Sequence, residues 1–336
     1  MVIEMIIEIK ALEPLVFNQA GEFNPGTIGL EKFKNSYPLP NFTSILGCLG
    51  SLFYKEDLID KNSSYMENIR KILTSAGLKD LRYLLLKCKI NNECRIYFPV
   101  NIKGEIRFYE VSDFQEKIKS KASFNELEDY LISNIKKTVH DYLEDQAEIK
   151  DVLIPIFSNK IGIKLKDFEK SVESGHLFSV KYLNYKPVEG NPVLEYSFLV
   201  LCSGSVKHIK DHSYLGGERR SVLVLSHDDN LNIDLKINKN VDNSDLGLGS
   251  YLEFEDKEGY RIIVLTSPIE LPESIGNEVC MKEIMKYVED YITGLFNIDN
   301  FTVFGSIEPL GGFDILRGKR KPIKLYLSTG SLIWER

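Results

Sequence analysis

A pair of glycines followed closely by arginines occurs twice in this chain, and such pairs mark places where a backbone can turn sharply or come close to a ligand. The first lies in Leu215-Gly-Gly-Glu-Arg-Arg220, and the second begins at Gly311 and Gly312 and reaches Arg320. Glycine adopts positive φ without a steric penalty and lets the backbone approach a ligand, and turned backbone N–H groups form anion-binding concavities. The repetition predicts a duplicated architecture in which each half carries a glycine-rich, cationic loop.

The second of these stretches reverses the charge of the chain. The formal net charge is −7, yet no acidic residue occurs from Ile315 to Ile333. The cations there are Arg317, Lys319, Arg320, Lys321 and Lys324. A basic run is often only a solvated face or tail. This one follows a glycine pair and is flanked by apolar strand residues, which favours contact with an RNA backbone.

Length and composition indicate two globular domains. The chain has 336 residues, of which 43% are hydrophobic, and a domain usually holds roughly 150 residues. No run approaches the roughly 18 apolar residues of a membrane span. Glu4 and Glu8 interrupt the apolar start, so no signal peptide is expected. Five cysteines without C-x-x-C spacing fit a reducing compartment. We therefore expect a soluble, cytoplasmic protein that does not contact a membrane.

The first half of the chain is expected to begin with a strand, a loop and a helix. Residues 2–9 alternate as a strand does. Residues 37–40, Tyr-Pro-Leu-Pro, are extended, and Asn41 or Thr43 then caps a helix. Further helices are expected over 61–76 and 124–148, strands over 81–90 and 95–100, and a hairpin at 101–104.

The second half repeats this scheme loosely. Strands are expected over 156–165, 175–180, 194–202 and 221–225, with a short polar helix or loop over 206–214. Beyond it, strands over 231–237 and 260–265 precede an amphipathic helix between Met281 and Phe296, and a last strand lies over 324–327 or 331–334.

Together these patterns predict an α+β fold with two ferredoxin-like (RRM-like) βαββαβ units. The first unit would span residues 1–228 and contain a helical insertion at about 60–150, and the second would span residues 229–336.

Three segments resemble one family. They are Leu215-Gly-Gly-Glu-Arg-Arg220, Asn159-Lys-Ile-Gly-Ile163 with Gly175-His-Leu-Phe178, and Gly311-Gly-Phe-Asp-Ile followed by Arg317-Gly-Lys-Arg-Lys-Pro322 and Gly330-Ser-Leu-Ile-Trp334. They are similar to those of the RAMP-superfamily third subunit of the type III-B (Cmr) CRISPR effector complex. Residues 12–15 and 37–40 are similar to the start of the same family.

The resemblance implies a fold, a ligand and partners. It implies two ferredoxin-like units with glycine-rich loops, and a β-hairpin thumb near residues 156–165 that wedges between nucleotides of the guide RNA. Members of this family hold the repeat-derived 5′ tag of the crRNA. They contact the large cyclase-like subunit and a neighbouring backbone RAMP subunit, and they are not themselves catalytic. No cofactor is implied.

Candidate RNA-binding residues follow from these patterns. They are Lys160, Lys164, His176, Gly216, Gly217, Arg219, Arg220, Gly311, Gly312, Arg317, Lys319, Arg320 and Lys321. Glycines allow phosphate to approach N–H groups, while guanidinium groups bind its oxygens. Each feature also has a plainer reading: a hairpin turn with solvated arginines, an amphipathic strand, or a surface histidine. Phe304 and Phe313 could stack on a base or belong to the core.

Two other function classes stay open. The first is a metal-independent RNA-processing endonuclease of the same superfamily that uses His176, His208 or His212 as general acid or base. The second is a scaffold without RNA contact. His208 and His212 have the i, i+4 spacing of helical metal ligands, but no third ligand is evident, so no metal is expected. Gly247-Leu-Gly249 is not followed by Lys-Ser/Thr, so it is not a P-loop. No pattern resembles paired catalytic carboxylates.

Overall fold

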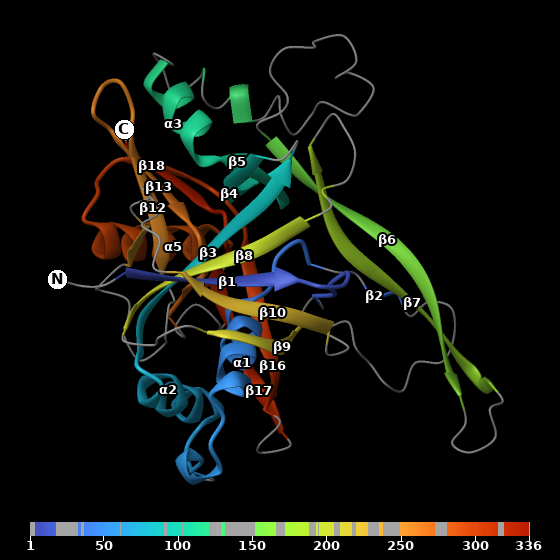
Figure 1. The fold of residues 1–336 in the computed structure, drawn as a ribbon. Coiled ribbons are helices and arrows are strands. Elements are labelled where there is room, and N and C mark those ends of the chain that lie inside the picture. The colour runs from blue at the N-terminus through green and yellow to red at the C-terminus, as the bar shows by residue number, and fades with distance from the viewer. Residues whose placement is uncertain are drawn as a thin grey trace.

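The computed structural model has a large curved sheet at its centre and a long hairpin that extends from one side (Figure 1). It describes residues 4–17, 33–34, 37–60, 62–90, 93–102, 104–120, 126, 129–131, 152–165, 172–187, 193, 195–204, 209–216, 220–227, 235–237, 249–272, 281–314 and 319–335. For residues 4, 33–34, 65–66, 80, 83–84, 159–165, 172–180, 235, 237, 281–285, 310–314 and 319–323 only the backbone is described.

Ten strands form the large sheet, in the order β2-β7-β6-β5-β4-β3-β8-β1-β10-β9. Its neighbouring strands pair antiparallel, except β2 and β7, which are parallel. The strands are β1 (Glu4–Ala11), β2 (Phe33–Lys34), β3 (Leu78–Ile90), β4 (Glu93–Ile102), β5 (Glu105–Glu110), β6 (Val152–Leu165), β7 (Val172–Pro187), β8 (Glu195–Gly204), β9 (Lys210–Leu215) and β10 (Arg220–His227).

Strand β1 lies inside this sheet, between β8 and β10, and only the face with Met5, Ile7, Ile9 and Ala11 is uniformly apolar. Met5, Ile7 and Ile9 pack in the larger core, whereas Ile6 packs in a second core on the opposite face. The second face also carries Lys10 and Glu8. Glu8 is buried and accepts hydrogen bonds from Ser197 Oγ at 2.7 Å and Lys87 Nζ at 3.0 Å.

Burial alone would raise the pKa of the Glu8 carboxyl. The hydrogen bonds from Ser197 and Lys87, and the nearby charges of Lys87 and His227, outweigh this effect and keep the pKa below its ordinary value. The His227 Nε2 atom lies 2.9 Å from Glu8 Oε2. Glu8 therefore remains a carboxylate in the middle of the sheet.

Helices lie below the large sheet, above it and on its left in the view of Figure 1. They are α1 (Phe42–Leu52), α2 (Tyr65–Ser75), α3 (Val111–Ser120) and α5 (Met281–Phe296), with a 3-10 turn at η1 (Glu56–Leu58). Helix α1 begins after Asn41, whose side chain accepts a hydrogen bond from Ser44 N at 2.9 Å. Helix α2 begins with a capping box between Ser64 and Glu67. Among the described residues, no helix is both long and apolar enough to span a membrane.

The C-terminal part of the chain forms two smaller sheets. Five strands lie in the order β11-β12-β13-β18-β15, and three in the order β14-β17-β16. The strands are β11 (Leu235–Ile237), β12 (Ser250–Glu255), β13 (Arg261–Leu265), β14 (Ile269–Glu270), β15 (Phe301–Phe304), β16 (Ile307–Asp314), β17 (Lys319–Leu327) and β18 (Leu332–Glu335).

The large sheet and the five-stranded sheet share a core. Phe98 of β4 contacts Phe114 of α3 and Phe254 of β12, with ring centroids 4.9 and 5.5 Å away. The buried Asn101 adds polar contacts: its N–H donates to Gly330 O at 2.7 Å, and its side-chain amide donates to Ser306 Oγ and Ser328 Oγ, each at 2.9 Å. The hairpin between β4 and β5 is therefore fixed to the end of β17 and the turn that follows it.

Several sequence predictions are confirmed. Asn41 caps the first helix, α2 lies within the helix expected over 61–76, and the hairpin at 101–104 joins β4 to β5, with Gly104 at φ +86°. The strands expected over 156–165 and 175–180 belong to β6 and β7. The amphipathic helix is α5, and both alternatives for the last strand exist, as β17 and β18.

Other predictions need correction. The helix or loop expected over 206–214 is wrong, because residues 210–215 form strand β9. Helix α3 was not predicted, since only Phe114 and Ile118 of its residues are buried apolar side chains. Most of the helix expected over 124–148 lies outside the described residues. The α+β class is confirmed. The two ferredoxin-like units and the boundary at residue 228 stay predictions.

Candidate nucleic-acid interface

The predicted RNA-binding residues lie on three β-hairpins. Lys160, Lys164 and His176 belong to the β6–β7 hairpin, the first glycine pair with Arg219 and Arg220 to the β9–β10 turn, and the second glycine pair with its cations to the β16–β17 hairpin. Gly217, Arg219 and Arg317 are outside the described residues. The side chains of Lys160, Lys164, His176, Lys319, Arg320 and Lys321 are likewise outside the described part.

The β6–β7 hairpin is the longest of the three. Its strands have 14 and 16 residues, and it projects from the body of the molecule (Figure 1). Lys160 pairs with Val180, and Ile163 with Leu177. Lys160 and Lys164 lie on β6, whose register with β7 shifts between Ile163 and Leu165, and His176 lies beside the residue that pairs with Ile163. The hairpin thus brings the three predicted residues onto one projecting ribbon.

The turn between β9 and β10 depends on a glycine. Gly216 has φ +77°, and a Cβ atom there would lie 2.4 Å from Val16 O and 3.0 Å from the ring of Phe17. A side chain is therefore excluded both by backbone conformation and by space. Close packing against residues 16 and 17 fixes where β10 begins, and with it the position of Arg220.

Arg220 is bound by two residues from distant parts of the chain. Its Nη1 atom lies 3.0 Å from Glu13 Oε2, and its Nη2 donates to the hydroxyl of Tyr182. The guanidinium carbon also lies 4.7 Å from the centroid of the Tyr182 ring, which adds a cation–π contact. Tyr182 belongs to β7, so Arg220 joins the β9–β10 turn to the base of the projecting hairpin.

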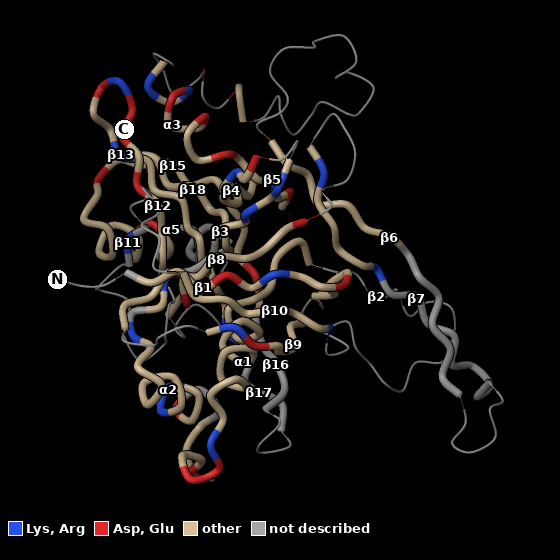
Figure 2. Tube along the Cα trace, viewed as in Figure 1, with Lys and Arg blue, Asp and Glu red and all other residues tan. Residues whose placement is uncertain are grey.

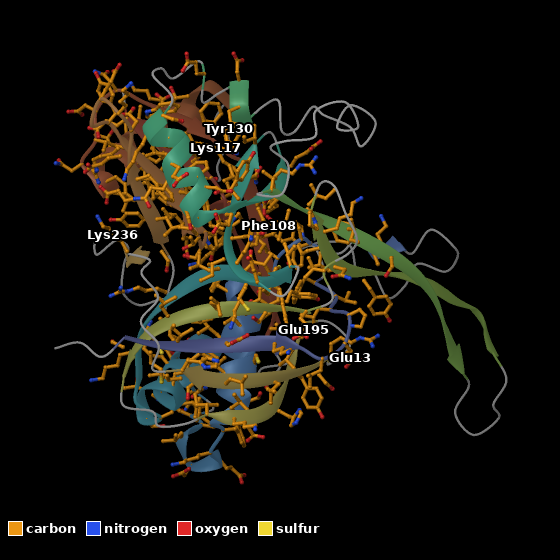
Figure 3. All side chains as sticks on the ribbon, turned by 45° about the horizontal axis from the view of Figure 1, so that its top comes forward. Glu13, Phe108, Lys117, Tyr130, Glu195 and Lys236 are labelled. Atoms are coloured by element: carbon orange, nitrogen blue, oxygen red, sulfur yellow. The ribbon has the colours of Figure 1, made fainter. Side chains whose placement is uncertain are left out.

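Glu13 binds a second donor next to Arg220. Its Oε1 atom accepts a hydrogen bond from Ser221 N at 2.6 Å. This backbone hydrogen bond, followed by the hydrogen bond and charge of Arg220, lowers the pKa of the Glu13 carboxyl. Figure 3 labels Glu13 on the side of the central sheet from which the β6–β7 hairpin extends.

The second glycine pair has a different setting. It lies within strand β16 rather than in a loop, and the register of β16 and β17 shifts between Leu310 and Gly312. Beyond this bulge, Gly312 pairs with Lys321 and Phe313 with Arg320. A glycine inside a strand often accompanies such a bulge, which bends and twists the strand. The tip of the hairpin, residues 315–318, is outside the described residues.

The base of the β16–β17 hairpin is fixed to the N-terminal part. The hydroxyl of Tyr37 donates to both carboxylate oxygens of Glu308 on β16, at 3.0 Å each. Burial, and then the charge of Glu308, raise the pKa of the Tyr37 hydroxyl well above its ordinary value, so it stays a donor. Tyr326 of β17 donates to Glu270 and packs against Phe42 of α1.

We call residues 13–17 and 37–39 the root segment, because all three hairpins contact it. Leu183 N of β7 donates to Leu15 O, and the Tyr185 hydroxyl of β7 donates to Pro38 O, both at 2.8 Å. The β9–β10 turn contacts it through Gly216, Arg220 and Ser221, and β16 contacts it through Glu308. The family resemblance includes residues 13–15 and 37–39 of this segment, but no sequence pattern predicted a role for Glu13, Tyr37 or Tyr182.

Charge on the body is mixed. Figure 2 shows Lys and Arg interspersed with Asp and Glu over the described elements rather than gathered on one face. Examples are the pairs of Lys10 with Glu195 at 2.6 Å and of Glu253 with Lys236 at 2.7 Å. The described elements therefore show no single cationic face in this view.

The spacing of His208 and His212 does not translate into a helical metal pair in the described part of the chain. His212 is exposed on strand β9, so the i, i+4 geometry expected for a helix with His208 does not apply, and His208 lies outside the described residues. No group of three His, Cys, Asp or Glu that could hold a metal ion occurs among the residues described.

Comparisons with known proteins agree with the sequence resemblance. No family model matches the chain. A curated relative, the CRISPR system CMR subunit Cmr3 of Saccharolobus solfataricus, is 22% identical over 331 residues, which cover 97% of this chain and 84% of the relative.

Solved structures match at the level of the fold. A chain of the Type III-B Cmr-beta complex bound to cognate target RNA has a TM-score of 0.60 at 19% identity, with 98% of this chain and 86% of that chain covered. A second structure of that complex, with target RNA and AMPPnP, also has a TM-score of 0.60, at 17% identity. The predicted resemblance to the third subunit of the Cmr complex is therefore confirmed by the sequence match, and a chain of a Cmr complex shares the fold over nearly the whole chain.

Proposed function

We propose that this chain is a non-catalytic subunit of a type III-B CRISPR RNA-guided effector complex and binds the 5′ tag of the crRNA. It docks the large cyclase-like subunit and a neighbouring backbone RAMP subunit. The observation that carries the proposal is the convergence of the β6–β7, β9–β10 and β16–β17 hairpins on one root segment. Each hairpin bears predicted RNA-binding residues.

The arrangement suits single-stranded RNA. Such RNA is bound through its backbone phosphates and its splayed bases. A projecting β-hairpin that carries cations can reach these groups. Lys160 and Lys164 supply charge on β6, and Lys319, Arg320 and Lys321 supply it on β17. Because the chain has net charge −7, affinity for RNA depends on these local cations rather than on a general attraction.

The fold that we propose for this function keeps two ferredoxin-like units divided near residue 228. In support, every strand of the ten-stranded sheet ends before residue 228, and every strand of the two smaller sheets begins after it. The projecting hairpin corresponds to the thumb, and its base is bound to the rest of the site through Tyr182, Leu183 and Tyr185.

Crosslinking within the purified complex tests the proposal. Photoreactive nucleotides are placed in the 5′ tag of the crRNA, and crosslinked peptides are mapped on every subunit. We expect crosslinks to β6–β7 and to one or both of the other hairpins. Crosslinks confined to neighbouring subunits would instead support the scaffold reading. Specific cleavage of repeat RNA by the chain in chelator, lost in variants of His176, His208 and His212, would support the endonuclease.

A further inference from the structure

Glu13 is bound in the way that a phosphate group would be bound. One carboxylate oxygen faces the guanidinium of Arg220 at 3.0 Å, and the other accepts from Ser221 N at 2.6 Å. Two oxygens held by a guanidinium and a backbone N–H beside a glycine turn are also the arrangement expected for a phosphodiester. The ligand at this position is thus an anion from the chain itself.

We propose that Glu13 occupies a phosphate site and that a phosphate of the crRNA 5′ tag displaces it when the guide binds. The inference rests on the proposed function and deepens it. It assigns Arg220 and the backbone N–H of Ser221 as the ligands of one phosphodiester. It assigns Tyr182 as the residue that positions Arg220, and Glu13 as the competing anion.

The donors of this site do not depend on Glu13 for their positions. The hydroxyl and ring of Tyr182 hold the guanidinium of Arg220. Ser221 is fixed between strands, since it pairs with Tyr214 of β9 and its carbonyl accepts a hydrogen bond from Leu12 N at 3.3 Å. When the carboxylate leaves, both donors therefore remain directed at the same point, and the incoming anion finds a formed site.

Glu13 is the partner that is able to leave. It lies beyond the end of β1 in a segment without regular structure, and its side chain is 35% exposed, compared with 22% for Arg220. The ion pair is only partly buried, so its net contribution to stability is modest. A phosphodiester carries the same single negative charge and offers more acceptor oxygens to the two donors. Before RNA arrives, the charge of Arg220 is neutralised, which reduces attraction for unrelated polyanions.

The test measures how a single-stranded RNA with the 5′-tag sequence binds the full-length chain, by fluorescence anisotropy over a series of salt concentrations. Glu13→Gln keeps the size and hydrogen-bond acceptor of the side chain but removes its charge. Its matched control is Glu195→Gln, which removes an exposed carboxylate paired with Lys10 on the same sheet. We expect Glu13→Gln to bind roughly threefold to tenfold more tightly than wild type at low salt, and Glu195→Gln to change affinity by less than about twofold.

The outcomes separate the two proposals. If wild type binds the RNA and a folded Glu13→Gln variant binds equally or more weakly, Glu13 and Arg220 form a permanent structural contact and the displacement is wrong. An equal gain in both variants would reduce the effect to net charge and also overturn it. If Glu13→Gln fails to fold, Glu13→Asp, too short to reach both donors, should show a smaller gain, and no gain counts against displacement. Absence of tag crosslinks in the assembled complex overturns the proposed function itself.

Discussion

The two glycine pairs share a sequence pattern but serve different structures. Gly216 is in a tight turn at positive φ, where a Cβ atom would collide with Val16 O. Gly312 follows a bulge inside strand β16 and pairs with Lys321. The first pair fixes the turn between β9 and β10, while the second accompanies a bulge in strand β16. Equal sequence motifs therefore do not establish equal roles.

Their neighbouring cations differ in the same way. Arg220 adjoins its turn and is bound by Glu13 and Tyr182. Lys319 and Lys321 lie on β17 toward the end of a hairpin whose anchoring contact, Glu308 with Tyr37, is several residues away. The comparison teaches that an arginine near a glycine turn can be bound by side chains of the protein itself.

The largest effect should come from Gly216→Ala. The substitution combines a strained φ of +77° with a clash at 2.4 Å, and we expect the free energy of unfolding to fall by about 3–4 kcal/mol. Chemical denaturation of the purified chain measures the loss. Gly259→Ala is the control, because Gly259 has φ +85° but nothing within 4 Å; it should lose about 1–2 kcal/mol. Equal losses would mean that space at Gly216 is unimportant.

The second prediction concerns RNA rather than stability. Replacing both Lys319 and Lys321 by Ala should weaken binding of the 5′-tag RNA roughly tenfold and reduce the salt slope by about 1.4, or about 0.7 for each lost phosphate contact. The melting temperature should not change. A titration at several salt concentrations measures both quantities. Unchanged affinity, or a destabilised protein, would show that these lysines contribute to the fold rather than to RNA binding.

Arg220→Lys should produce a moderate loss of stability. Lysine retains the charge but cannot bind Glu13, donate to Tyr182 and stack on its ring together, so we expect about 1 kcal/mol of destabilisation. Arg320→Lys is the matched control in the other glycine motif and should leave the melting temperature unchanged. If both variants lose the same stability, the contrast between the two motifs does not hold.

The smallest effect is on acid sensitivity. The pKa of Glu13 is lowered in the folded chain, so its contribution is present above the ordinary carboxyl value of 4.5 and is lost as the pH falls through the lowered value. Glu13→Gln lacks this loss and should show a slightly flatter decline of melting temperature as the pH falls below 4.5. A steeper decline in the variant would contradict the assigned direction.

Local signals in the sequence predicted local structure well. The cap at Asn41 and the hairpin at Gly104 depend on residues within a few positions of each other. Strand β9 was missed because Lys210, Asp211 and His212 are all exposed, which leaves no apolar alternation to recognise. A polar strand of this kind is typical of the edge of a sheet, where charged side chains discourage further pairing.

The candidate site was predictable only in part. The family resemblance identified the hairpins, but the partners of Arg220 are 207 and 38 residues away in sequence, at Glu13 and Tyr182. Nothing in a local pattern indicates that these three side chains meet. Tyr37 and Glu308, separated by 271 residues, were missed for the same reason. Their contacts exist only because the fold brings the root segment to all three hairpins.

The contact of Asn101 with Ser328 has a consequence for the order of folding. The two residues are 227 positions apart, so during synthesis the β4–β5 hairpin emerges long before its acceptor. Until the residues that follow strand β17 have been synthesised, the side-chain amide of Asn101 is hydrogen-bonded to water, and the apolar side chains around it are exposed to solvent. Domains fold largely in the order in which they leave the ribosome. The β4–β5 hairpin therefore cannot complete its packing until the C-terminal part of the chain has been synthesised. During this interval the nascent chain exposes apolar side chains that can aggregate or bind chaperones.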